Sequence, residues 1–390
     1  MKILITSDLG YPYIGGGESY VINLSKALID LGHEVHWATS RIGNTSEKEN
    51  YEGIQIHRLR ILFPNSYLFP GRHTFPFTSF IPLVRLSKKM DVLQFTTFLA
   101  GTIGAKVGKF AKKPSILFCH EFFGKLWKTI GQSKLERNLF PHIEKYIAKQ
   151  NYTCALTPSE YSKMTLARAG YPENEITVIP HGIDKIFTKD VSGLPLRKKY
   201  GLENHKLFGY TGRLSIKGTG QSKNLLGLLE ATKLVVKEIP DARLVLGGSG
   251  FEDIKKHISS MGLEKYVAYV GKRPFNEVPQ FYSMCNAIVC PALSDGYCFV
   301  LGEASACGVP IIATDQGSHP ERIIDGKNGL ITKKDPESIA EGILKVLKDK
   351  KRSERLGEEG KKMYRKDSWK SVAKKYVDVY EGIIKGYKNK

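Results

Sequence analysis

The chain has 390 residues, 41% of them hydrophobic and 25% charged, a composition typical of a soluble globular protein. Its length exceeds what one ordinary hydrophobic core organises, so two domains are expected. The formal net charge of +20 indicates an anionic partner or surface, but no zinc finger, RNP-type aromatic motif or arginine repeat accompanies it, so nucleic acid is not an expected partner.

The first predicted strand, KILITS (2–7), has one basic residue and no cleavage site, so no secretory signal is expected. A glycine turn formed by Gly15, Gly16 and Gly17 follows, and a helical pattern begins directly after it. Glycines here let the backbone approach a ligand closely, and a helix N-terminus favours an anion. A dinucleotide-binding fold would need G-x-G-x-x-G and an acid closing the second strand. That strand ends in HWATS, so a dehydrogenase is disfavoured.

A later strand of the first half, SILFCHEF (115–122), carries His120 near its carboxyl end. At this position the side chain would shuttle a proton or orient a substrate hydroxyl. A hydrogen-bonded structural histidine is the other interpretation, and both stay open. The remaining strand-like segments of this half are EVHWATS, VLQFTT, CALTPS and ITVIPHG.

The segment 121–140, EFFGKLWKTIGQSKLERNLF, is both aromatic and basic. An aromatic face edged by lysines suits the surface of an anionic membrane. An apolar helix face is also typical of core packing, so this second interpretation stays open. Read as a helix, the segment places on one side Phe123, Leu126, Trp127 and Ile130, with Lys125, Lys128 and Lys134 largely off that stripe.

A break in the strand–helix alternation falls at 186–204, where glycine, proline and charged residues replace any strand or clean helical period. The alternation resumes with KLFGYTGR, ARLVLGG, VAYVGKR, NAIVCPA, PIIATDQ and GLITKK. Near-continuous apolar strands alternating with helices predict parallel sheets covered on both faces. The expected fold class is therefore α/β, with two doubly wound Rossmann-like domains and a site in the cleft between them. The predicted parts are 1–185, a linker at 186–204, 205–365 and a last helix at 366–390.

The loop after KLFGYTGR carries candidate ligands for a diphosphate. Arg213 ends the strand and Lys223 lies at the start of the next helix, so a guanidinium fork and an ammonium point charge would converge there. A solvated basic loop is the alternative interpretation. Lys217 is the competing lysine, but it lies in a Gly-flanked loop, whereas the helix fixes the direction of Lys223. We therefore favour Lys223.

The segment SDGYCFVLGEASACGVP (294–310) holds two acids around an uncharged stretch. Asp295 is expected in a loop after the strand NAIVCPA, and Glu303 early in the following helix. Turn chemistry and a helix dipole would explain both acids without any function. The GYCF loop is expected to be exposed. Its backbone amides, around Cys298, Phe299 and Val300, would then face phosphate or sugar oxygens, and a carboxylate behind them would face the hydroxyls of a ribose.

These motifs together resemble family 4 of the retaining glycosyltransferases, of GT-B fold, whose mark is Glu-x7-Glu followed by an EAxACGxPVI helix. The chain reads DGYCFVLGEASACGVPII at that place, and GGGE, GHEV, PSE, VIPHGID, YTGRL and VGKRP match in order. The tryptophan-bearing last helix also matches, and in the family it crosses back onto the N-terminal domain. The resemblance covers most of the chain and is loose only over 41–110, where an acceptor pocket would be built.

The resemblance implies a role for each candidate residue. Glu303 would bind the ribose, and Asp295 takes the place of the first glutamate, which contacts the transferred sugar. Arg213 and Lys223 would bind the diphosphate, and His120 would be the catalytic histidine of the cleft. The implied function is transfer of a sugar, with retention of anomeric configuration, from a nucleotide-diphosphate sugar to a hydroxyl acceptor.

Two departures from the family leave the donor sugar open: aspartate replaces glutamate at Asp295, and Cys298 replaces a small glycine. The chain contains no Asp-x-Asp, so no metal and no other cofactor is expected at the chemical step. The charge of the leaving diphosphate would be met by Arg213, Lys223 and the helix N-terminus. The expected partners are a nucleotide-sugar donor, a lipid-linked or glycan acceptor and an anionic membrane surface.

Other classes of function remain to be separated from this one. A nucleotide-sugar epimerase shares the architecture but needs no acceptor, and a polyanion-binding protein explains the charge but not the motifs. Transfer to a soluble acceptor is a further alternative. The six cysteines are scattered, which favours reduced thiols in a cytoplasmic protein over a zinc site. No apolar run reaches the ~18 residues of a membrane span, so the expected location is cytoplasmic, with peripheral attachment at the inner face of the membrane.

Overall fold

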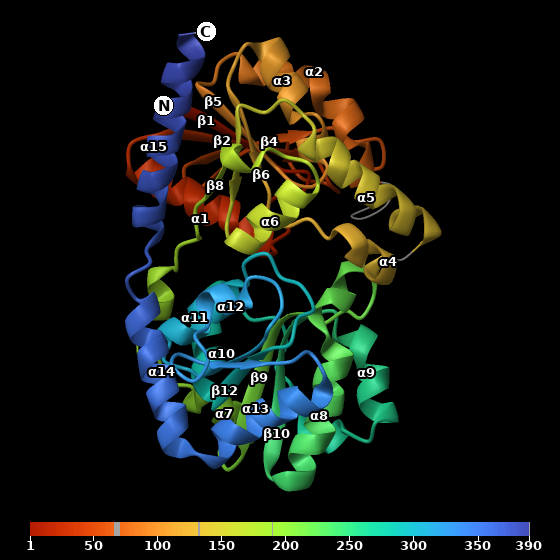
Figure 1. Ribbon diagram of the computed structural model, residues 1–390, viewed down its shortest axis with the longest axis vertical. Coiled ribbons are helices and arrows are strands. Elements are labelled where there is room, and N and C mark those ends of the chain that lie inside the picture. Colours follow the sequence, from red (N-terminus) through yellow and green to blue (C-terminus); the bar gives the residue numbers. More distant parts are fainter. Residues whose placement is uncertain (66–70, 132, 189, 390) are drawn as a thin grey trace. The chain divides into compact units, whose positions relative to one another are not determined.

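The structure is a computed structural model that describes residues 1–65, 71–131, 133–188 and 190–389. The chain forms two compact units, each built around its own sheet (Figure 1). Unit 1 comprises Met1–Lys125, Leu139–Gly182 and Trp369–Lys390, and unit 2 comprises Leu126–Asn138 and Ile183–Ser368.

Unit 1 is built on an 8-stranded sheet with the order β3-β4-β2-β1-β5-β6-β7-β8. Strands β3 and β4 pair antiparallel, and the other neighbours are parallel. The parallel strands are apolar almost throughout because both faces of the sheet are covered. The strands are β1 (Lys2–Thr6), β2 (Glu34–Ser40), β3 (Lys48–Tyr51), β4 (Ile54–Leu59), β5 (Val92–Thr96), β6 (Ser115–Phe118), β7 (Cys154–Thr157) and β8 (Ile176–Val178).

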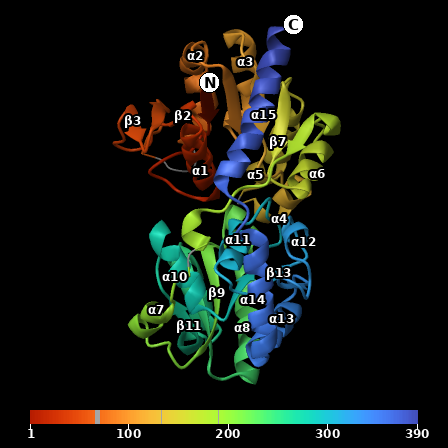
Figure 2. The same ribbon diagram turned by 90° about the vertical axis from the view of Figure 1, so that its left-hand side faces the viewer.

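Helices cover both faces of this sheet. On one face, α2, α3, α5 and α6 bury a core against alternate strand residues such as Leu93 and Leu117. On the other face lie α1 and α15, which run beside each other (Figure 2). The helices are α1 (Gly16–Asp30), α2 (Phe75–Ser87), α3 (Gly104–Ala111), α5 (Lys134–Ala148), α6 (Glu160–Arg168) and α15 (Trp369–Lys388).

A buried chain of hydrogen bonds fastens α15 to the rest of unit 1. Tyr380 donates to Oε1 of Gln94 at 2.7 Å, and Nε2 of Gln94 donates to the hydroxyl of Tyr20 at 2.9 Å. Tyr20 in turn donates to the hydroxyl of Tyr376 at 3.1 Å. Since buried polar groups are costly unless paired, these bonds select this position of the helix. The predicted return of the last helix to the N-terminal domain is confirmed.

Unit 2 is built on a 6-stranded parallel sheet with the order β11-β10-β9-β12-β13-β14. Numbered along the chain, this is the Rossmann order 3-2-1-4-5-6, whose direction reverses between the first and fourth strands. Here those strands are β9 and β12, so their carboxyl ends flank the switch point. The strands are β9 (Lys206–Arg213), β10 (Ala242–Ser249), β11 (Val267–Tyr269), β12 (Ala287–Cys290), β13 (Ile311–Thr314) and β14 (Leu330–Thr332).

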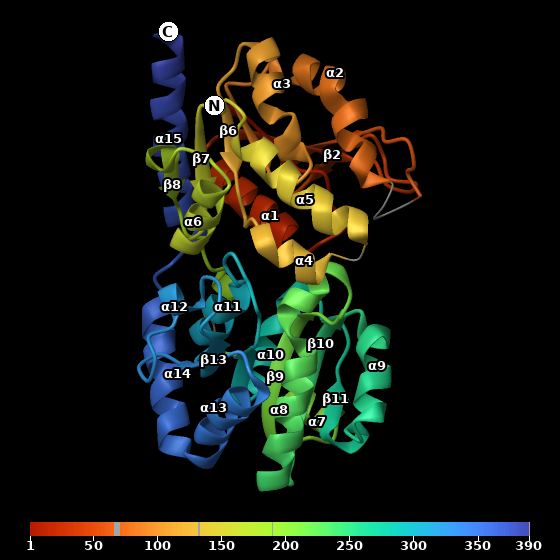
Figure 3. The same cartoon turned by 45° about the vertical axis from the view of Figure 1, so that its right-hand side comes forward.

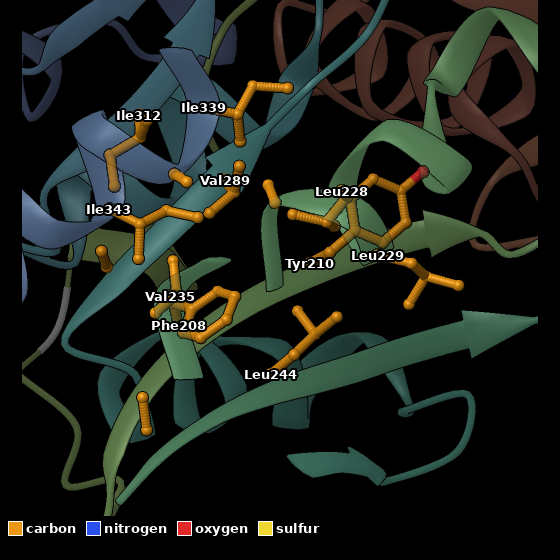
Figure 4. Packing of buried hydrophobic residues seen from close by; sticks show 14 of the residues in the cluster. Phe208, Tyr210, Leu228, Leu229, Val235, Leu244, Val289, Ile312, Ile339 and Ile343 are labelled. Atoms are coloured by element: carbon orange, nitrogen blue, oxygen red, sulfur yellow. The ribbon is translucent and has the colours of Figure 1, made fainter. Parts of the chain in front are cut away.

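The unit 2 sheet also buries a core on each face. Phe208 and Leu244 point toward α8 and α13 (Figure 4), whereas their neighbours Leu207 and Val245 pack on the opposite side with α7, α10 and α11. The helices are α4 (Trp127–Ile130), α7 (Leu194–Lys199), α8 (Leu225–Glu238), α9 (Phe251–Ser260), α10 (Val278–Met284), α11 (Phe299–Ala306), α12 (His319–Arg322), α13 (Pro336–Lys348) and α14 (Lys350–Tyr364).

Short 3-10 segments occur in both units. They are η1 (Arg72–Thr74), η2 (Ala100–Thr102), η3 (Gly124–Leu126), η4 (Glu173–Glu175), η5 (Lys185–Thr188), η6 (Gly218–Lys223), η7 (Glu264–Tyr266) and η8 (Phe275–Glu277).

The division into units differs from the sequence-based parts in two places. Residues 186–204, predicted as a linker, lie inside unit 2, where α7 forms and Leu196 and Leu202 are buried in the core. The segment 126–138, assigned with the N-terminal part from sequence, belongs to unit 2 because α4 packs against η6. Among the described residues, no helix combines the length and the apolar character needed to span a bilayer.

Candidate active site

The predicted diphosphate ligands both lie at the carboxyl end of β9 in unit 2. Arg213 is the last residue of the strand, is exposed, and donates to Oγ1 of Thr219 at 2.9 Å. Lys223 ends η6, directly before α8. Lys217 is on the same loop but reaches Asp253 at 3.5 Å and is 71% exposed. The sequence-based preference for Lys223 therefore agrees with the geometry, because Lys223 alone of the two lysines faces the loop after β12.

Asp295 lies in that loop and accepts hydrogen bonds with both carboxylate oxygens. Lys223 Nζ donates to Oδ2 at 2.6 Å, and the N–H groups of Tyr297 and Cys298 donate to Oδ1 at 3.2 and 2.7 Å. Burial alone would raise the pKa of Asp295, but Lys223, His319 and the amide donors outweigh it and lower the pKa to about 2. Asp295 is therefore a fixed anion at neutral pH.

The loop 296–299 differs from the sequence-based expectation. The N–H groups of Tyr297 and Cys298 point to the Asp295 carboxylate rather than outward, and the Tyr297 side chain is buried. The expectation of an exposed loop whose amides all face a ligand is wrong for these two amides, because the aspartate folds the loop around itself as an Asx turn. Phe299 and Val300 open α11, where the first N–H groups lack intrahelical acceptors.

Glu303 lies one turn into α11 and is half-buried. The hydroxyl of Tyr282, on α10, donates to its Oε2 at 2.6 Å. Burial raises the pKa of Glu303 to about 7, although the Tyr282 hydrogen bond opposes that shift. Near neutral pH this carboxyl group is poised between its protonated and ionised forms, which is a property of many functional acids.

Arg322, on α12, holds the loop 296–299 in place. Its Nη1 donates to the carbonyls of Tyr297 and Cys298 at 2.8 and 3.0 Å, and its guanidinium lies 3.9 Å from the Tyr297 ring centroid. A Cβ atom at Gly302 would lie 2.6 Å from Nη2 of Arg322, so a larger residue there would displace the guanidinium. These contacts fix where the loop presents Asp295 and Cys298.

Cys298 precedes α11 with a left-handed φ of 52°. A hydrogen bond from the Cys290 thiol, together with His319, lowers the pKa of Cys298 to about 6, although burial opposes that shift. His319 is fully buried at the start of α12. The loops after β12 and β13 thus bring the Cys298 sulfur, the His319 imidazole and the Asp295 carboxylate together, with their ligand atoms within 4.8 Å of one another.

The predicted site residues of unit 1 also lie together. His120 follows β6, its N–H donates to Oγ1 of Thr97 at 3.2 Å, and its carbonyl accepts from Ser162 at 2.5 Å. A Cβ atom on Gly17 would lie 3.5 Å from Nε2 of His120, so the glycine turn of Gly15, Gly16 and Gly17 begins α1 beside the ring. Burial lowers the pKa of His120 to about 4, so the ring is neutral at pH 7.

Two of the four residues on the predicted aromatic stripe of segment 121–140 are not exposed, as a membrane contact would require. Trp127 and Ile130 are buried, at 5% and 0% exposure, and α4 packs against η6 within unit 2. Phe123 N–H and Gly124 N–H donate to the buried Glu144 carboxylate, each at 2.8 Å, which fixes the start of the segment. The core interpretation is confirmed for Trp127 and Ile130, and the membrane interpretation of this stripe is wrong.

Sequence reasoning missed four residues that organise the candidate site of unit 1 or that of unit 2. Three of them lie on elements that follow a neighbouring strand or pack on a predicted site residue, so the parallel topology was the signal that would have found them, whereas Arg58 lies on β4 and gave no such signal. Arg58 is buried and donates to the carbonyl of Tyr11, at 2.8 Å from Nη2, which holds the loop before the glycine turn. The others are Tyr282, His319 and Arg322, described above.

Comparison with known proteins agrees with this architecture. Residues 14–185 match the family described as Glycosyltransferase Family 4, and residues 195–363 match Glycosyl transferases group 1. A crystal structure of Anabaena Alr3699/HepE in complex with UDP-glucose has a TM-score of 0.79 and 20% identity, covering 98% of this chain and 100% of that one. Two parallel-sheet α/β units with a returning last helix define a glycosyltransferase of GT-B fold.

Within that class, the chain belongs to the family 4 type of glycosyltransferases, as the motifs predicted. N-acetyl-alpha-D-glucosaminyl L-malate synthase of Bacillus anthracis is 25% identical over 100% of this chain and 99% of that protein. The GDP-mannose-dependent alpha-(1-6)-phosphatidylinositol monomannoside mannosyltransferase of Mycolicibacterium smegmatis is 27% identical over 54% of this chain and 57% of that protein. The matches give no support to the epimerase alternative.

Proposed function

We propose that this glycosyltransferase moves a hexose from a nucleotide-diphosphate sugar to a hydroxyl of a membrane glycolipid or lipid-linked glycan, with retention of anomeric configuration. The observation that carries the donor half of this proposal is the grouping of Lys223, Asp295 and Glu303 at the carboxyl ends of β9 and β12. Ligands of doubly wound sheets bind at this switch point. The UDP-glucose complex of the Anabaena protein supports a nucleotide sugar as the ligand class.

In this proposal, the side chains around the switch point would contact the diphosphate, the ribose and the transferred sugar of the nucleotide sugar. Lys223 has three N–H donors, so it can hold Asp295 and a phosphate oxygen at the same time. Arg213 would add a guanidinium fork to the diphosphate. The Glu303 carboxylate would accept from both ribose hydroxyls, and Asp295 would face the transferred sugar.

In the proposed reaction, negative charge grows on the diphosphate as the sugar–phosphate bond breaks. Fixed cations at that place stabilise the transition state more than the ground state, and the loss of one such donor typically costs ~3 kcal/mol. Arg213 and Lys223 take that role in the proposal, without a metal ion. No second carboxylate is assigned as a nucleophile, so the acceptor hydroxyl would attack from the face that the diphosphate leaves.

The donor half is tested by incubating the protein with a panel of nucleotide sugars, with and without glycolipid and soluble acceptors, and measuring the nucleoside diphosphate released. Acceptor-dependent release that is unaffected by EDTA is expected, and nuclear magnetic resonance of the product should show the anomeric configuration of the donor. Asp295→Asn should lower turnover and change which sugars are accepted. Release without any acceptor, or an inverted product, would contradict the proposed reaction.

The acceptor half is supported by an exposed apolar and basic surface on unit 1, which we name the α2–α3 surface. It consists of Phe77, Ile81 and Arg85 on α2 and Lys109 and Phe110 on α3, two helices that pack side by side (Figure 3). Phe77, Ile81 and Phe110 are 84%, 62% and 64% exposed. Spacing of four residues aligns Phe77, Ile81 and Arg85 on one stripe. Aromatic side chains edged by cations suit the interface of an anionic membrane.

Co-sedimentation with vesicles that contain an anionic phospholipid tests this acceptor half. Binding is expected at low salt and should fall as salt rises, because the cations of the surface are screened. Phe77→Ser with Ile81→Ser should abolish binding, whereas Phe275→Ser, which alters an aromatic side chain of unit 2 that is 46% exposed, should not. If the double variant binds as the native chain does, or if sugar is transferred only to soluble acceptors, the membrane proposal is wrong.

A further inference from the structure

The loops after β12 and β13 bring three metal-ligating side chains together. One carboxylate oxygen of Asp295, the Cys298 sulfur and one ring nitrogen of His319 all lie within 4.8 Å of one another. The thiol of Cys290, at the end of β12, interacts with the Cys298 sulfur from the strand side. The donor set of this cluster is therefore sulfur, nitrogen and oxygen, and it is drawn from separate loops rather than from one sequence motif.

The hydrogen bonds of His319 show which nitrogen is available. Nδ1 lies 3.1 Å from the carbonyl of Thr314 and 3.3 Å from its hydroxyl, and that hydroxyl already donates to the carbonyl of Ala292 at 2.5 Å. Both atoms facing Nδ1 are thus acceptors, so Nδ1 carries the proton in the neutral ring. Nε2 then keeps its lone pair, as in metal-binding histidines whose other nitrogen donates to a backbone carbonyl.

His319 Nε2 is the second observation that points to a ligand. The residue is 0% exposed, and Nε2 has no partner at hydrogen-bonding geometry among the described residues. A buried imidazole nitrogen without such a partner is costly, and the Cys298 sulfur is a neighbouring group that interacts with the ring. A cation bound between the sulfur and the nitrogen would satisfy both atoms.

We propose that Cys298, His319 and Asp295 form a binding site for a thiophilic divalent cation of the zinc type, and that the bound cation excludes the nucleotide sugar. Thiolate and imidazole select such ions over Mg²⁺, which requires an octahedron of oxygens. The exclusion rests on the proposed function, which places Asp295 against the transferred sugar. The cation would then act as a competitor of the donor and not as a cofactor of transfer.

The site itself is tested without any donor, by titrating the full chain with Cd²⁺ and following thiolate-to-metal absorbance, then by competition with Zn²⁺ and Mg²⁺. One strongly bound Cd²⁺ per chain is expected, displaced by Zn²⁺ but not by Mg²⁺. Cys298→Gly removes the sulfur, and glycine accepts the left-handed φ of 52° without strain. His319→Asn keeps a donor in the place of Nδ1 and loses Nε2. Each variant should weaken Cd²⁺ binding by at least about tenfold.

Cys307→Ser is the matched control, because Cys307 is a partly exposed thiol just after the same helix and lies outside the cluster. The affinity of the Cys307→Ser variant for Cd²⁺ should equal that of the native chain. Native affinity in Cys298→Gly, or a loss in Cys307→Ser, would overturn the assignment. Far-ultraviolet circular dichroism of each variant separates loss of the site from loss of the fold.

The overlap with the donor is tested separately. Cd²⁺ affinity should fall as UDP-glucose, or whichever nucleotide sugar the panel identifies, is added, and Zn²⁺ should raise the KM for the donor without changing kcat. Cd²⁺ binding that no nucleotide sugar affects would refute the exclusion. If the site binds Cd²⁺ as expected while no nucleotide sugar supports transfer, the proposed function fails and the cation site stands.

Discussion

Nucleotide binding should become tighter as pH rises from 6 to 8, because the carboxyl group of Glu303 must be ionised to accept hydrogen bonds from both ribose hydroxyls. Burial raises the pKa of Glu303 to about 7. With that pKa, the ionised fraction is roughly a tenth at pH 6 and roughly nine-tenths at pH 8. The dissociation constant of the nucleotide should therefore fall by about tenfold over this range, which corresponds to ~1.4 kcal/mol.

The assay is isothermal titration of the native chain with the nucleoside diphosphate at pH 6, 7 and 8, beside Glu303→Gln. Glutamine cannot ionise, so the variant retains only the titration of the nucleotide itself, and the difference between the two proteins isolates Glu303. At pH 8 the variant should bind about ten- to a hundredfold more weakly, since a hydrogen bond to a charged group contributes ~1.5–3 kcal/mol.

Tyr282→Phe provides a directional control. The Tyr282 hydroxyl donates to Oε2 of Glu303 at 2.6 Å and favours the ionised form, so its removal should raise the pKa of Glu303 further. The pH at which binding tightens should then move above that of the native chain. If the native chain and Glu303→Gln show the same pH dependence, Glu303 does not hold the ribose.

The remaining predictions concern the cations, the linkage of Glu303 to stability and the buried network. Lys223→Ala and Arg213→Ala should each reduce transfer by roughly a hundredfold in a donor-release assay, whereas a comparable loss in Lys217→Ala would show that the diphosphate lies along the other side of the loop. Since the folded-state pKa of Glu303 is above its ordinary value, its stabilising contribution is complete below pH 4.5 and is lost as pH rises through 7. Glu303→Gln should accordingly raise Tm relative to the native chain at pH 8 more than at pH 5, and an equal effect at both would contradict the shift. Tyr380→Phe removes the donor to Gln94 and should lower the free energy of unfolding by about 1–3 kcal/mol in urea denaturation, and an unchanged value would contradict a stabilising role for this bond.

Local patterns were sufficient to predict the strands of both sheets and to favour Lys223 over Lys217, although the role of Lys223 at a diphosphate stays a prediction. The apolar runs identify strands such as β9 and β12 because a strand buried on both faces has no alternation to confuse with a surface helix. Lys223 was separated from Lys217 because the start of a helix fixes the direction of a side chain and a glycine-flanked loop does not. The contact between Lys223 and Asp295 at 2.6 Å was not predicted, because the two residues lie 72 positions apart in the chain.

Features that depend on distant partners could not be predicted in the same way. The burial of Trp127 requires η6, which lies far along the chain, and an amphipathic stripe looks the same whether protein or lipid covers it. The residues 186–204 were predicted as a linker because their glycine, proline and charged residues show no clean helical period. Their place in unit 2 depends on contacts with residues far along the chain: Arg197, for example, donates to the carbonyl of Met284 at 2.7 Å. The amides of Cys298 and Tyr297 were misplaced because the Asp295 side chain competes for them.

The return of α15 to unit 1 has a consequence for the order of events on the ribosome. Almost all of unit 2 lies between Gly182 and Trp369 in the chain, so it is synthesised, and its sheet is complete, before α15 exists. Until then Gln94 and Tyr20 lack the hydroxyl groups of Tyr380 and Tyr376, and of the two helices on that face of the unit 1 sheet only α1 is present. The unit that is translated first is therefore completed last, because its final helix is the last element of the chain to be synthesised.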